Sequence, residues 1–460
     1  MTVPVRQLTL FDSTCIIVGI IVGVAIYESS RLIALQVPGP GWLIGMWLLG
    51  GLISLLGALC YAELATTYPR EGGDYVYLTR AYGRPCGFLF AWAQLWVVRP
   101  GSIGAMAFVF AKYAQEIWPV ARGNLGLLGY ATVSIVGLTL VNIIGVREGK
   151  WTQNLLTVVK VLGLVAIFVV ALFWAPLRPP APALATVAPP TASSLFFPLS
   201  DKFAFAMIFI FYAYGGWHEM AYVGAEVRNP ERNILRAVVL GTLSVTVIYV
   251  LVNLAFLKTL GFAGTQQSQA LAADVLRLAT GAWGARLISL LICVSALGVI
   301  NGQIFTGARI YYAMGTEHRL YAWLGRWNPW LGTPIWSLLI QAVVTLGLVI
   351  GFGLIQKGDQ NGFQSMVTFT TPVFWIFMLL VGVGLVVLRY REPDTRRPYR
   401  VPGYPLVPIL FCCSSLFMIW KSLAWAVANR SPEALWSIVI LAVGLALSCY
   451  DPKRSRSTAS

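Results

Sequence analysis

Four ionisable residues stand inside stretches of sequence that are otherwise almost wholly apolar. They are Arg99, Lys160 and the adjacent pair His218 and Glu219. If such a stretch crosses a lipid bilayer, a charged side chain at its centre costs about 2.5–3.5 kcal/mol on insertion scales. Charged residues of this kind face the protein interior and mark ion or substrate pathways. These four residues are therefore the first candidates for chemistry in the chain.

Each of the four residues also has a purely structural interpretation. Lys160 could extend to a membrane interface, Arg99 could pair with a nearby acid, and His218 could be a hydrogen-bonded core histidine. The functional alternatives are a proton-carrying ammonium at Lys160, a substrate-facing guanidinium at Arg99 and a proton relay or pocket role at His218. We expect Glu219 to pair with a cation, which could be Lys160, Arg99 or a substrate amine.

Glycines interrupt two of the apolar stretches. The first contains Gly19-Ile-Ile-Val-Gly23 and the second contains Tyr214-Gly-Gly-Trp217. Gly-x-x-x-Gly is often a close helix–helix contact, whereas a Gly-Gly pair costs about 2 kcal/mol of helix propensity relative to alanine. Glycine-interrupted segments at corresponding places in two halves of a chain indicate the binding site of a secondary transporter. The freed N–H and C=O groups can hold the carboxylate and the ammonium of an amino acid.

The elements that carry these residues are too apolar for a water-soluble protein. Of 460 residues, 58% are hydrophobic and 11% are charged, against about a quarter charged in a soluble domain. The chain is therefore expected in a lipid bilayer. Its net charge of +15 is explained by the basic loops of a membrane protein, so we expect no nucleic-acid partner. The seven cysteines have no metal-ligand spacing, and their odd count implies no disulfide framework.

Twelve apolar stretches have a length suited to crossing a membrane. They lie at about residues 14–35, 42–66, 86–112, 124–144, 155–175, 203–226, 237–257, 286–314, 335–355, 367–388, 405–426 and 434–450. Basic residues are more numerous in the loops on the N-terminal side, so we expect both termini in the cytoplasm and a multi-pass protein of the cell (inner or plasma) membrane. No cleaved signal peptide is expected. The predicted fold class is an all-α membrane protein.

The loops between these stretches are too short to hold a soluble catalytic domain. The longest, residues 176–202, is rich in proline and alanine and is expected to be an extended extracellular linker. The stretch around Ser268–Thr280 has helical spacing and is expected to lie along the surface. The sequence contains no phosphate-binding loop, no HExxH motif and no Cys/His cluster. We therefore expect neither an enzyme nor a cofactor or metal site.

A series of motifs resembles the amino acid–polyamine–organocation transporters, and within them the L-type, or heteromeric light-chain, amino acid transporters. Single motifs are weak evidence, but this series follows the family's order from residue 15 to about residue 400. The motifs are Gly19-x-x-x-Gly23-x-x-Ile26, Cys60-Tyr-Ala-Glu63-Leu, Tyr68-Pro-Arg-Glu-Gly-Gly-Asp-Tyr75, Val159-Lys160-Val-Leu, Tyr214-Gly-Gly-Trp217, Glu226-Val-Arg-Asn-Pro230-Glu-Arg-Asn233 and Gly298-Val-Ile-Asn301-Gly302-Gln-Ile-Phe305-Thr-Gly-Ala-Arg309.

The resemblance implies a LeuT-like fold, in which two inverted five-helix repeats precede two peripheral helices. Residues 1–175 would form the first repeat, residues 203–390 the second, and residues 391–460 the peripheral helices with a short cytoplasmic tail. Helices 1 and 6 would be discontinuous. The chain would then move an amino acid by alternating access, as a permease or an exchanger.

The resemblance also implies a substrate site at the two glycine breaks. The carboxylate would meet the backbone of helix 1, and the amine would meet carbonyls near Ile21 and in helix 6. Tyr212 would be an aromatic gate, and Trp375 would bound the side-chain pocket. The implied substrate-binding residues are Ile20, Ile21, Val22, Gly23, Val24, Ala25, Arg99, Tyr212, Ala213, Tyr214, Gly215, Trp217, Glu219, Asn301 and Trp375. Lys160 stands where sodium-coupled relatives bind a cation, which implies sodium-independent transport.

Two features depart from the family's pattern. The usual Gly-Ser-Gly of helix 1 is replaced by Gly23-Val24-Ala25, which would narrow the carboxylate cradle, and Glu28 follows on the same helix. Together with Glu219, these features favour a polyamine or organic-amine carrier as the alternative. A non-transporting amino acid sensor is a second alternative.

The same resemblance bears on the partners of the chain. Animal light chains pair by disulfide through a cysteine between spans 3 and 4, and residues 114–125 contain no cysteine. We therefore expect no disulfide-linked heavy chain. The expected partners are a small amino acid substrate and the lipid bilayer. Glu63 and Glu226, at the inner ends of their spans, are expected to form ion pairs with basic residues.

Overall fold

The computed structural model is built of helices. It describes residues 6–70, 72–119, 124–173, 200–268, 271–280, 282–355, 362–428 and 432–450. The helices of the first half are α1 (Leu10–Ile21), α2 (Ala25–Gln36), α3 (Pro40–Thr67), α4 (Asp74–Tyr82), α5 (Arg84–Ala93), η1 (Gln94–Val98), α6 (Arg99–Ile117), α7 (Asn124–Ile144) and α8 (Val146–Phe173). Those of the second half are α10 (Asp201–Tyr214), η4 (Trp217–Glu226), α11 (Pro230–Gln267), α12 (Leu271–Thr280), α13 (Ala282–Glu317), α14 (Ile335–Ile355), α15 (Gly362–Arg391), α16 (Leu406–Ala428) and α17 (Pro432–Tyr450).

Within the described residues, nine helices are long and apolar enough to cross a membrane. They lie at Pro40–Thr67, Arg84–Gln115, Asn124–Ile144, Arg147–Val169, Pro230–Gln267, Arg286–Glu317, Ile335–Leu354, Ser365–Arg391 and Leu406–Ala424. Each overlaps one of the twelve predicted stretches. The other three predicted stretches coincide with α1 followed by α2, with α10 followed by η4, and with the shorter helix α17.

The first and sixth predicted stretches are each divided into two segments. α1 ends at Ile21 and α2 begins at Ala25. α10 ends at Tyr214, and the segment after it, η4, is a 3₁₀-helix of 10 residues rather than an α-helix. Gly216, between the two, has a φ of 130°, which glycine adopts without steric penalty. Runs of 3₁₀-helix this long are uncommon and often mark a hinge.

Several predicted boundaries differ from those of the structure, among them the start of the helix that carries Lys160. The stretch around Lys160 was predicted from residue 155, but α8 begins at Val146, so Lys160 lies much further inside its helix. The stretch around Ser268–Thr280 forms α12, as its spacing predicted. The predicted loop at residues 176–202 lies outside the described residues except for its last three, of which two already belong to α10.

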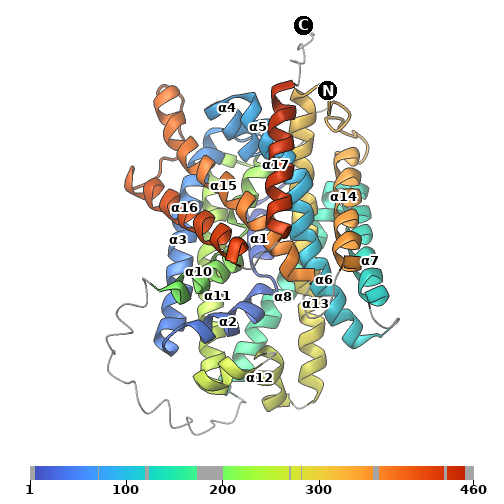
Figure 1. Cartoon of the computed structure of the whole chain (residues 1–460), viewed down its shortest axis with the longest axis vertical. Coiled ribbons are helices and arrows are strands. Elements are labelled where there is room, and N and C mark those ends of the chain that lie inside the picture. The colour runs from blue at the N-terminus through green and yellow to red at the C-terminus, as the bar shows by residue number, and fades with distance from the viewer. Residues whose placement is uncertain are drawn as a thin grey trace.

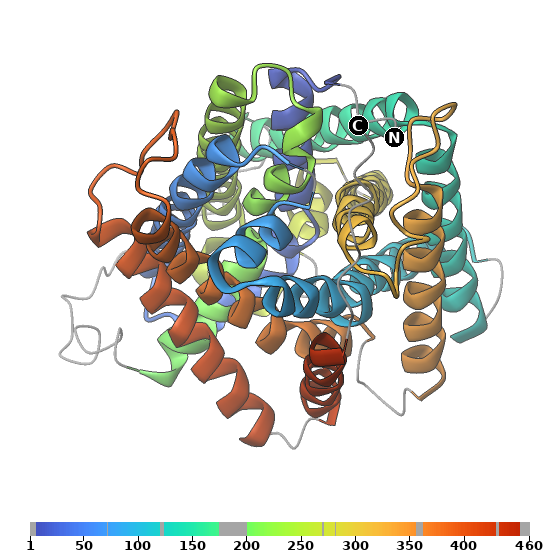
Figure 2. The same cartoon turned by 90° about the horizontal axis from the view of Figure 1, so that it is seen from above.

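The packing of the helices places the two breaks in the middle of the bundle. α1 contacts α8, α11, α13 and η4, and α3 packs along α11. α4 lies at one end of the bundle and α2, α10 and α12 lie toward the other (Figure 1). Seen from above, α16 and α17 lie at the margin, and α7 and α14 lie side by side at another edge (Figure 2). The central position of α1 and η4 sets up the candidate site.

Candidate functional site

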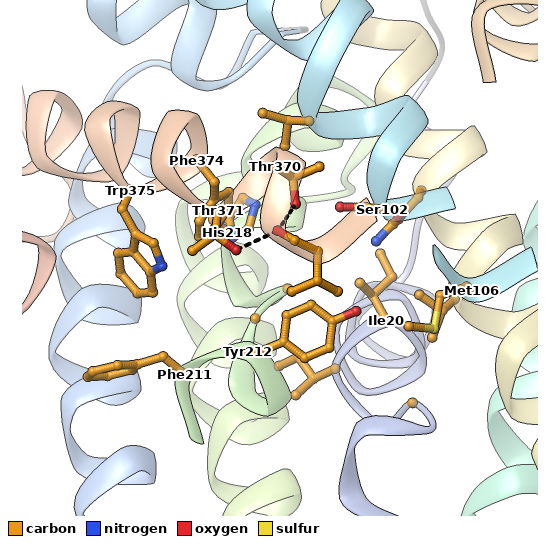
Figure 3. Close-up of a pocket in the computed structure, with 18 of the residues that line it drawn as sticks. Ile20, Ser102, Met106, Phe211, Tyr212, His218, Thr370, Thr371, Phe374 and Trp375 are labelled. Carbon is orange, nitrogen blue, oxygen red and sulfur yellow. Dashed lines mark hydrogen bonds between the residues drawn. The ribbon is translucent and has the colours of Figure 1, made fainter. Parts of the chain in front are cut away.

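A cavity of about 150 Å³ lies between the two helix breaks. Figure 3 shows Ile20 of α1, Tyr212 of α10 and Trp375 of α15 around it. Gly23 of the first break and Gly216 of the second line the same space. A cavity of about this volume in another protein binds benzene, so the cavity has room for one small molecule.

The structure brings together just over half of the predicted substrate-binding residues. Those that line the cavity are Ile20, Ile21, Gly23, Arg99, Tyr212, Gly215, Glu219 and Trp375. Those whose side chains are described and do not line it are Val22, Val24, Ala213, Tyr214, Trp217 and Asn301. The side chain of Ala25 lies outside the described part of the chain, as does that of Glu28.

Several of the residues away from the cavity have structural contacts. The hydroxyl of Tyr214 donates to a backbone carbonyl of α3 at 2.9 Å. Trp217 packs edge-on against Tyr61, with ring centroids 5.1 Å apart. Asn142 of α7 donates to the side-chain oxygen of Asn301 at 2.8 Å, in a fully buried contact between helices. These side chains fix the helices around the cavity rather than the contents of the cavity.

Lys160 occupies the first break. Its Nζ donates to the backbone carbonyls of Gly19 at 2.7 Å, Val22 at 2.9 Å and Ser295 at 3.1 Å. All three donors of the ammonium are thereby used, and the side chain is 1% exposed. The Ser295 hydroxyl also donates to the Val22 carbonyl, at 3.3 Å. Carbonyls left open by the unwound helix are thus bound by a cation that the protein itself supplies.

Tyr249 of α11 connects the two breaks. Its hydroxyl lies 2.7 Å from the carbonyl oxygen of Ile21 and 3.0 Å from that of Ala213. These carbonyls belong to the set expected to receive the substrate amine, and each has a second lone pair for it. Sequence reasoning missed Tyr249 because a tyrosine in an apolar span carries no signal that separates it from packing aromatics.

The two glycines of the Gly-x-x-x-Gly motif, Gly19 and Gly23, have different roles. A Cβ atom at Gly19 would overlap Gln153 and Thr157 of α8, so Gly19 permits close packing of the two helices. Gly23 lies in the break and lines the cavity. Both interpretations of the Gly-x-x-x-Gly motif therefore hold, each for one glycine.

A π-helical turn directly precedes Arg99, which lines the cavity. Pro100 cannot donate a backbone hydrogen bond, and its ring crowds the carbonyl four residues earlier. The backbone is π-helical from Gln94 to Val98, directly before Arg99, as is common near functional sites. Arg99 Nη2 donates to Glu219 Oε2 at 2.8 Å, and both side chains are almost fully buried. Of the three cations considered for Glu219, the structure pairs it with Arg99.

His218 does not behave as a fully hydrogen-bonded core histidine. Its Nε2 lies 3.4 Å from Glu219 Oε1, whereas its Nδ1 is buried without a hydrogen-bond partner. Gln303 has an unpartnered buried Oε1 as well, and both residues line the cavity. Figure 3 shows the imidazole beside Thr370 and Thr371, whose hydroxyls donate to a backbone carbonyl of α15. This wall of the cavity is therefore polar.

Buried ion pairs hold the helices together toward the end of the bundle that carries α4. Glu63 Oε2 lies 2.5 Å from Arg389 Nη2, and Glu226 Oε1 lies 2.7 Å from Arg309 Nε. The expectation that both glutamates form ion pairs is confirmed. The Arg309–Glu226 pair is 1% exposed on both sides and does not line the cavity.

Asp74, the first residue of α4, is a buried acid that the sequence analysis did not single out. Its Oδ2 accepts hydrogen bonds from the hydroxyls of Tyr61 at 2.9 Å and Tyr222 at 2.8 Å. Burial raises the pKa of the Asp74 carboxyl to about 6, and His218 and the two hydroxyl groups oppose that rise. Asp74 thus anchors α4 to α3 and to η4, the segment that follows the second break.

Comparison with known proteins identifies the family. A family model described as "Amino acid permease" matches residues 8–447. The chain is 30% identical over 454 residues to the b(0,+)-type amino acid transporter 1 of Mus musculus, covering 96% of this chain and 86% of that protein. It is 28% identical to the cystine/glutamate transporter of Homo sapiens (91% and 80%) and 28% identical to the serine/threonine exchanger SteT of Bacillus subtilis (91% of both).

These matches confirm the resemblance seen in the motifs, and the relatives are transporters rather than enzymes. They cover nearly the whole chain, including both breaks, Lys160 and all residues that line the cavity. The chain is a multi-pass membrane protein and belongs to the amino acid permease family.

Proposed function

We propose that this protein carries a small amino acid across the cell membrane by alternating access, without sodium. Its family supplies the broad activity, amino acid transport. The observation that carries the finer proposal is the cavity shared by the two helix breaks. Unwound backbone beside a cavity offers both N–H and C=O groups, which are the groups that a zwitterion needs.

In this proposal, the substrate carboxylate binds at the start of α2. The first N–H groups of a helix have no partner within it and form a positive dipole end. α2 begins at Ala25, and the residue before it, Val24, makes no side-chain cap. Val24 does not line the cavity, so the backbone rather than its side chain contacts the carboxylate. The ammonium then faces the carbonyls of Ile21 and Ala213, with Tyr212 as the gate.

The proposed architecture has twelve spans, with two inverted repeats at residues 1–175 and 203–390 and peripheral helices at residues 391–460. Helices that such a repeat relates are five spans apart. Four pairs of this kind pack together: α1 with η4, α3 with α11, α6 with α13 and α7 with α14. The distribution of basic residues supports cytoplasmic termini.

Sodium independence rests on Lys160. Its ammonium binds carbonyls of α1 and α13 that would otherwise suit a cation, and a second cation beside it would be repelled. We retain the expectation that no disulfide-linked heavy chain is required. The organic-amine alternative loses one of its supports, because Glu219 is already paired with Arg99.

The test is uptake of a panel of labelled amino acids into proteoliposomes, preloaded with amino acids or left empty, in sodium or choline buffer. We expect uptake that choline leaves unchanged. Uptake only into preloaded vesicles identifies an exchanger, and equal uptake into empty vesicles identifies a uniporter or proton-coupled carrier. Uptake that collapses in choline contradicts sodium independence. Uptake of amines alone contradicts the amino acid assignment.

A further inference from the structure

One wall of the cavity contains a complete ion pair. Arg99 on α6 and Glu219 on η4 both line the cavity, and their side chains are 3% and 4% exposed. Among the lining side chains that the structure describes, these two are the permanently charged ones. Arg99 begins α6, and Glu219 lies on η4, the segment that follows the second break. The pair therefore sets the charge that a bound substrate meets.

Each of the two charges is paired with the other and bound by neighbouring polar groups. Arg99 donates from Nη2 to Glu219, from Nε to Gln94 Oε1 at 3.2 Å and from Nη1 to Thr306 Oγ1 at 3.2 Å. Glu219 Oε2 also accepts from the Thr306 hydroxyl at 2.6 Å. The guanidinium lies over the ring of Tyr222, 5.0 Å from its centroid. The pair is internally neutralised and its geometry is fixed by neighbours.

A neutral wall discriminates against charged side chains. An ionised side chain that enters a buried cavity loses its hydration and gains nothing in return unless it meets an opposite charge. Here each possible opposite charge is already bound to its partner. A polar neutral side chain does gain, because His218 Nδ1 and Gln303 Oε1 lie buried and without partners on the same cavity. An unmet buried polar atom favours a ligand that can hydrogen-bond to it.

We propose that the Arg99–Glu219 pair makes this transporter selective for amino acids with neutral, hydrogen-bonding side chains, such as a hydroxyl or a carboxamide. The pair excludes acidic and basic side chains because each member cancels the other. The inference rests on the proposed function and names the substrate class of that same site.

The experiment uses charge-unmasking variants in proteoliposomes. Glu219→Gln leaves Arg99 without its counter-ion, and Arg99→Gln leaves Glu219 without its own. Uptake of labelled serine is measured with unlabelled serine, glutamine, glutamate and lysine as competitors. All competition assays are run in one buffer at one pH, so that the charge of each competitor is the same for every variant.

In the wild type, we expect serine and glutamine to compete and glutamate and lysine to compete at least about tenfold less well. Glu219→Gln should strengthen competition by glutamate about tenfold, and Arg99→Gln should do the same for lysine. The double variant should return to the wild-type order. These gains correspond to about 1.4 kcal/mol each.

The matched control is the second buried pair, Arg309–Glu226, which does not line the cavity. Glu226→Gln and Arg309→Gln remove a counter-ion in the same way and should leave the order of competitors unchanged. If they change that order as Glu219→Gln does, the shift is a general effect of losing a buried pair, and the proposal is wrong.

Two further results would overturn the proposal. If glutamate or lysine competes as well as serine for the wild-type protein, the predicted selectivity is absent. This result does not depend on whether the variants fold. If Glu219→Gln and Arg99→Gln still transport serine and keep the wild-type order of competitors, the pair has a structural role only. Failure of the proposed function is distinct from both, because the wild type would then take up no amino acid.

Discussion

The two helix breaks look alike in sequence, but they are completed in opposite ways. At the first break, the protein itself binds a freed carbonyl, because Lys160 and Ser295 both donate to the carbonyl of Val22, and only Gly23 of that break lines the cavity. The second break consists of Gly215 and Gly216, and both line the cavity. The first break is therefore held in place by the Lys160 ammonium, whereas the second break contributes glycine backbone to the surface of the cavity. Tyr249 joins them by contacting a carbonyl beside each.

This difference suggests which break moves. A frame with three hydrogen bonds from one ammonium resists rearrangement, since each unmet buried carbonyl costs about 1–3 kcal/mol. The second break continues into a 3₁₀-helix, whose hydrogen bonds have poorer geometry than those of an α-helix. We therefore expect η4 to move relative to α1 during transport.

Removing the internal cation should have the largest effect. Lys160→Met leaves the carbonyls of Gly19, Val22 and Ser295 without their shared donor. We expect a loss of about 3–4 kcal/mol in stability and a fall in transport of at least about tenfold. Thermal unfolding and proteoliposome uptake measure the two effects.

The matched control for that prediction is Lys150→Met on the same helix. Lys150 Nζ lies 3.3 Å from Asp12 Oδ2, and the two side chains are 18% and 6% exposed. Asp12 keeps its hydrogen bonds from Thr9 and Asn154 in the variant, so the loss of Lys150 should cost less, about 1–2 kcal/mol. Equal effects of the two substitutions would show that the position of Lys160 at the break is unimportant.

A side chain at the second break should be nearly as harmful. Gly216→Ala combines a strained φ with a Cβ atom 2.8 Å from Ile20 of α1. We expect a loss of about 2–3 kcal/mol and a reduced transport rate. Gly261 also has a positive φ, but a Cβ atom there would meet nothing within 4 Å. Gly261→Ala therefore measures the cost of the strained φ alone. If Gly261→Ala is as harmful as Gly216→Ala, close approach of the two breaks is not what requires glycine.

Tyr249→Phe removes the one hydroxyl group that contacts both breaks. The carbonyls of Ile21 and Ala213 lose a shared donor, so stability should fall by about 1–2 kcal/mol and transport by a few-fold. Tyr214→Phe, which removes a hydroxyl bonded to α3 instead, should alter transport less. Uptake rates of the two variants, normalised to folded protein, decide the matter. Equal rates would mean that Tyr249 is not a bridge between the breaks.

The smallest expected effect concerns Asp74, which anchors η4 through Tyr222. Because its pKa is raised from 3.8 to about 6 by burial, the folded state binds more protons than the unfolded state between these values. Its contribution to stability is therefore lost as pH rises through about 6. Between pH 5 and 7.5 we expect a loss of about 1.4 kcal/mol, which Asp74→Asn should abolish. If the unfolding temperature falls equally with rising pH in the wild type and in Asp74→Asn, the assignment is contradicted.

Much of the frame could be predicted from the sequence because it has strong local signals. The glycine breaks disturb otherwise regular apolar runs, and a lysine inside such a run must find acceptors. Tyr249 and Ser295 could not be predicted, because nothing distinguishes them from ordinary span residues until α11 and α13 are packed against α1. Trp217 and Asn301 show the converse, since they matched family motifs yet contact other helices rather than the cavity.

The pairing of Arg99 with Glu219 lies between these cases. Sequence reasoning named both residues and allowed three cations for the glutamate, but it could not choose among them. The choice depends on how α6, which follows a π-helical turn, is placed relative to η4, and that placement is not visible in the periodicity of the sequence. A side chain's direction relative to a distant helix is a tertiary property.

The central claim is that an amino acid binds between the two breaks while Lys160 keeps the cation position. It is tested most directly by an electron cryomicroscopy structure of the purified protein with its best-transported amino acid, in sodium-containing buffer. We predict density for the ligand between Gly23 and Gly216, its carboxylate at the start of α2, and the Lys160 ammonium still on the carbonyls of Gly19 and Val22. Ligand density elsewhere, or an ion at those carbonyls with Lys160 displaced, would contradict the account.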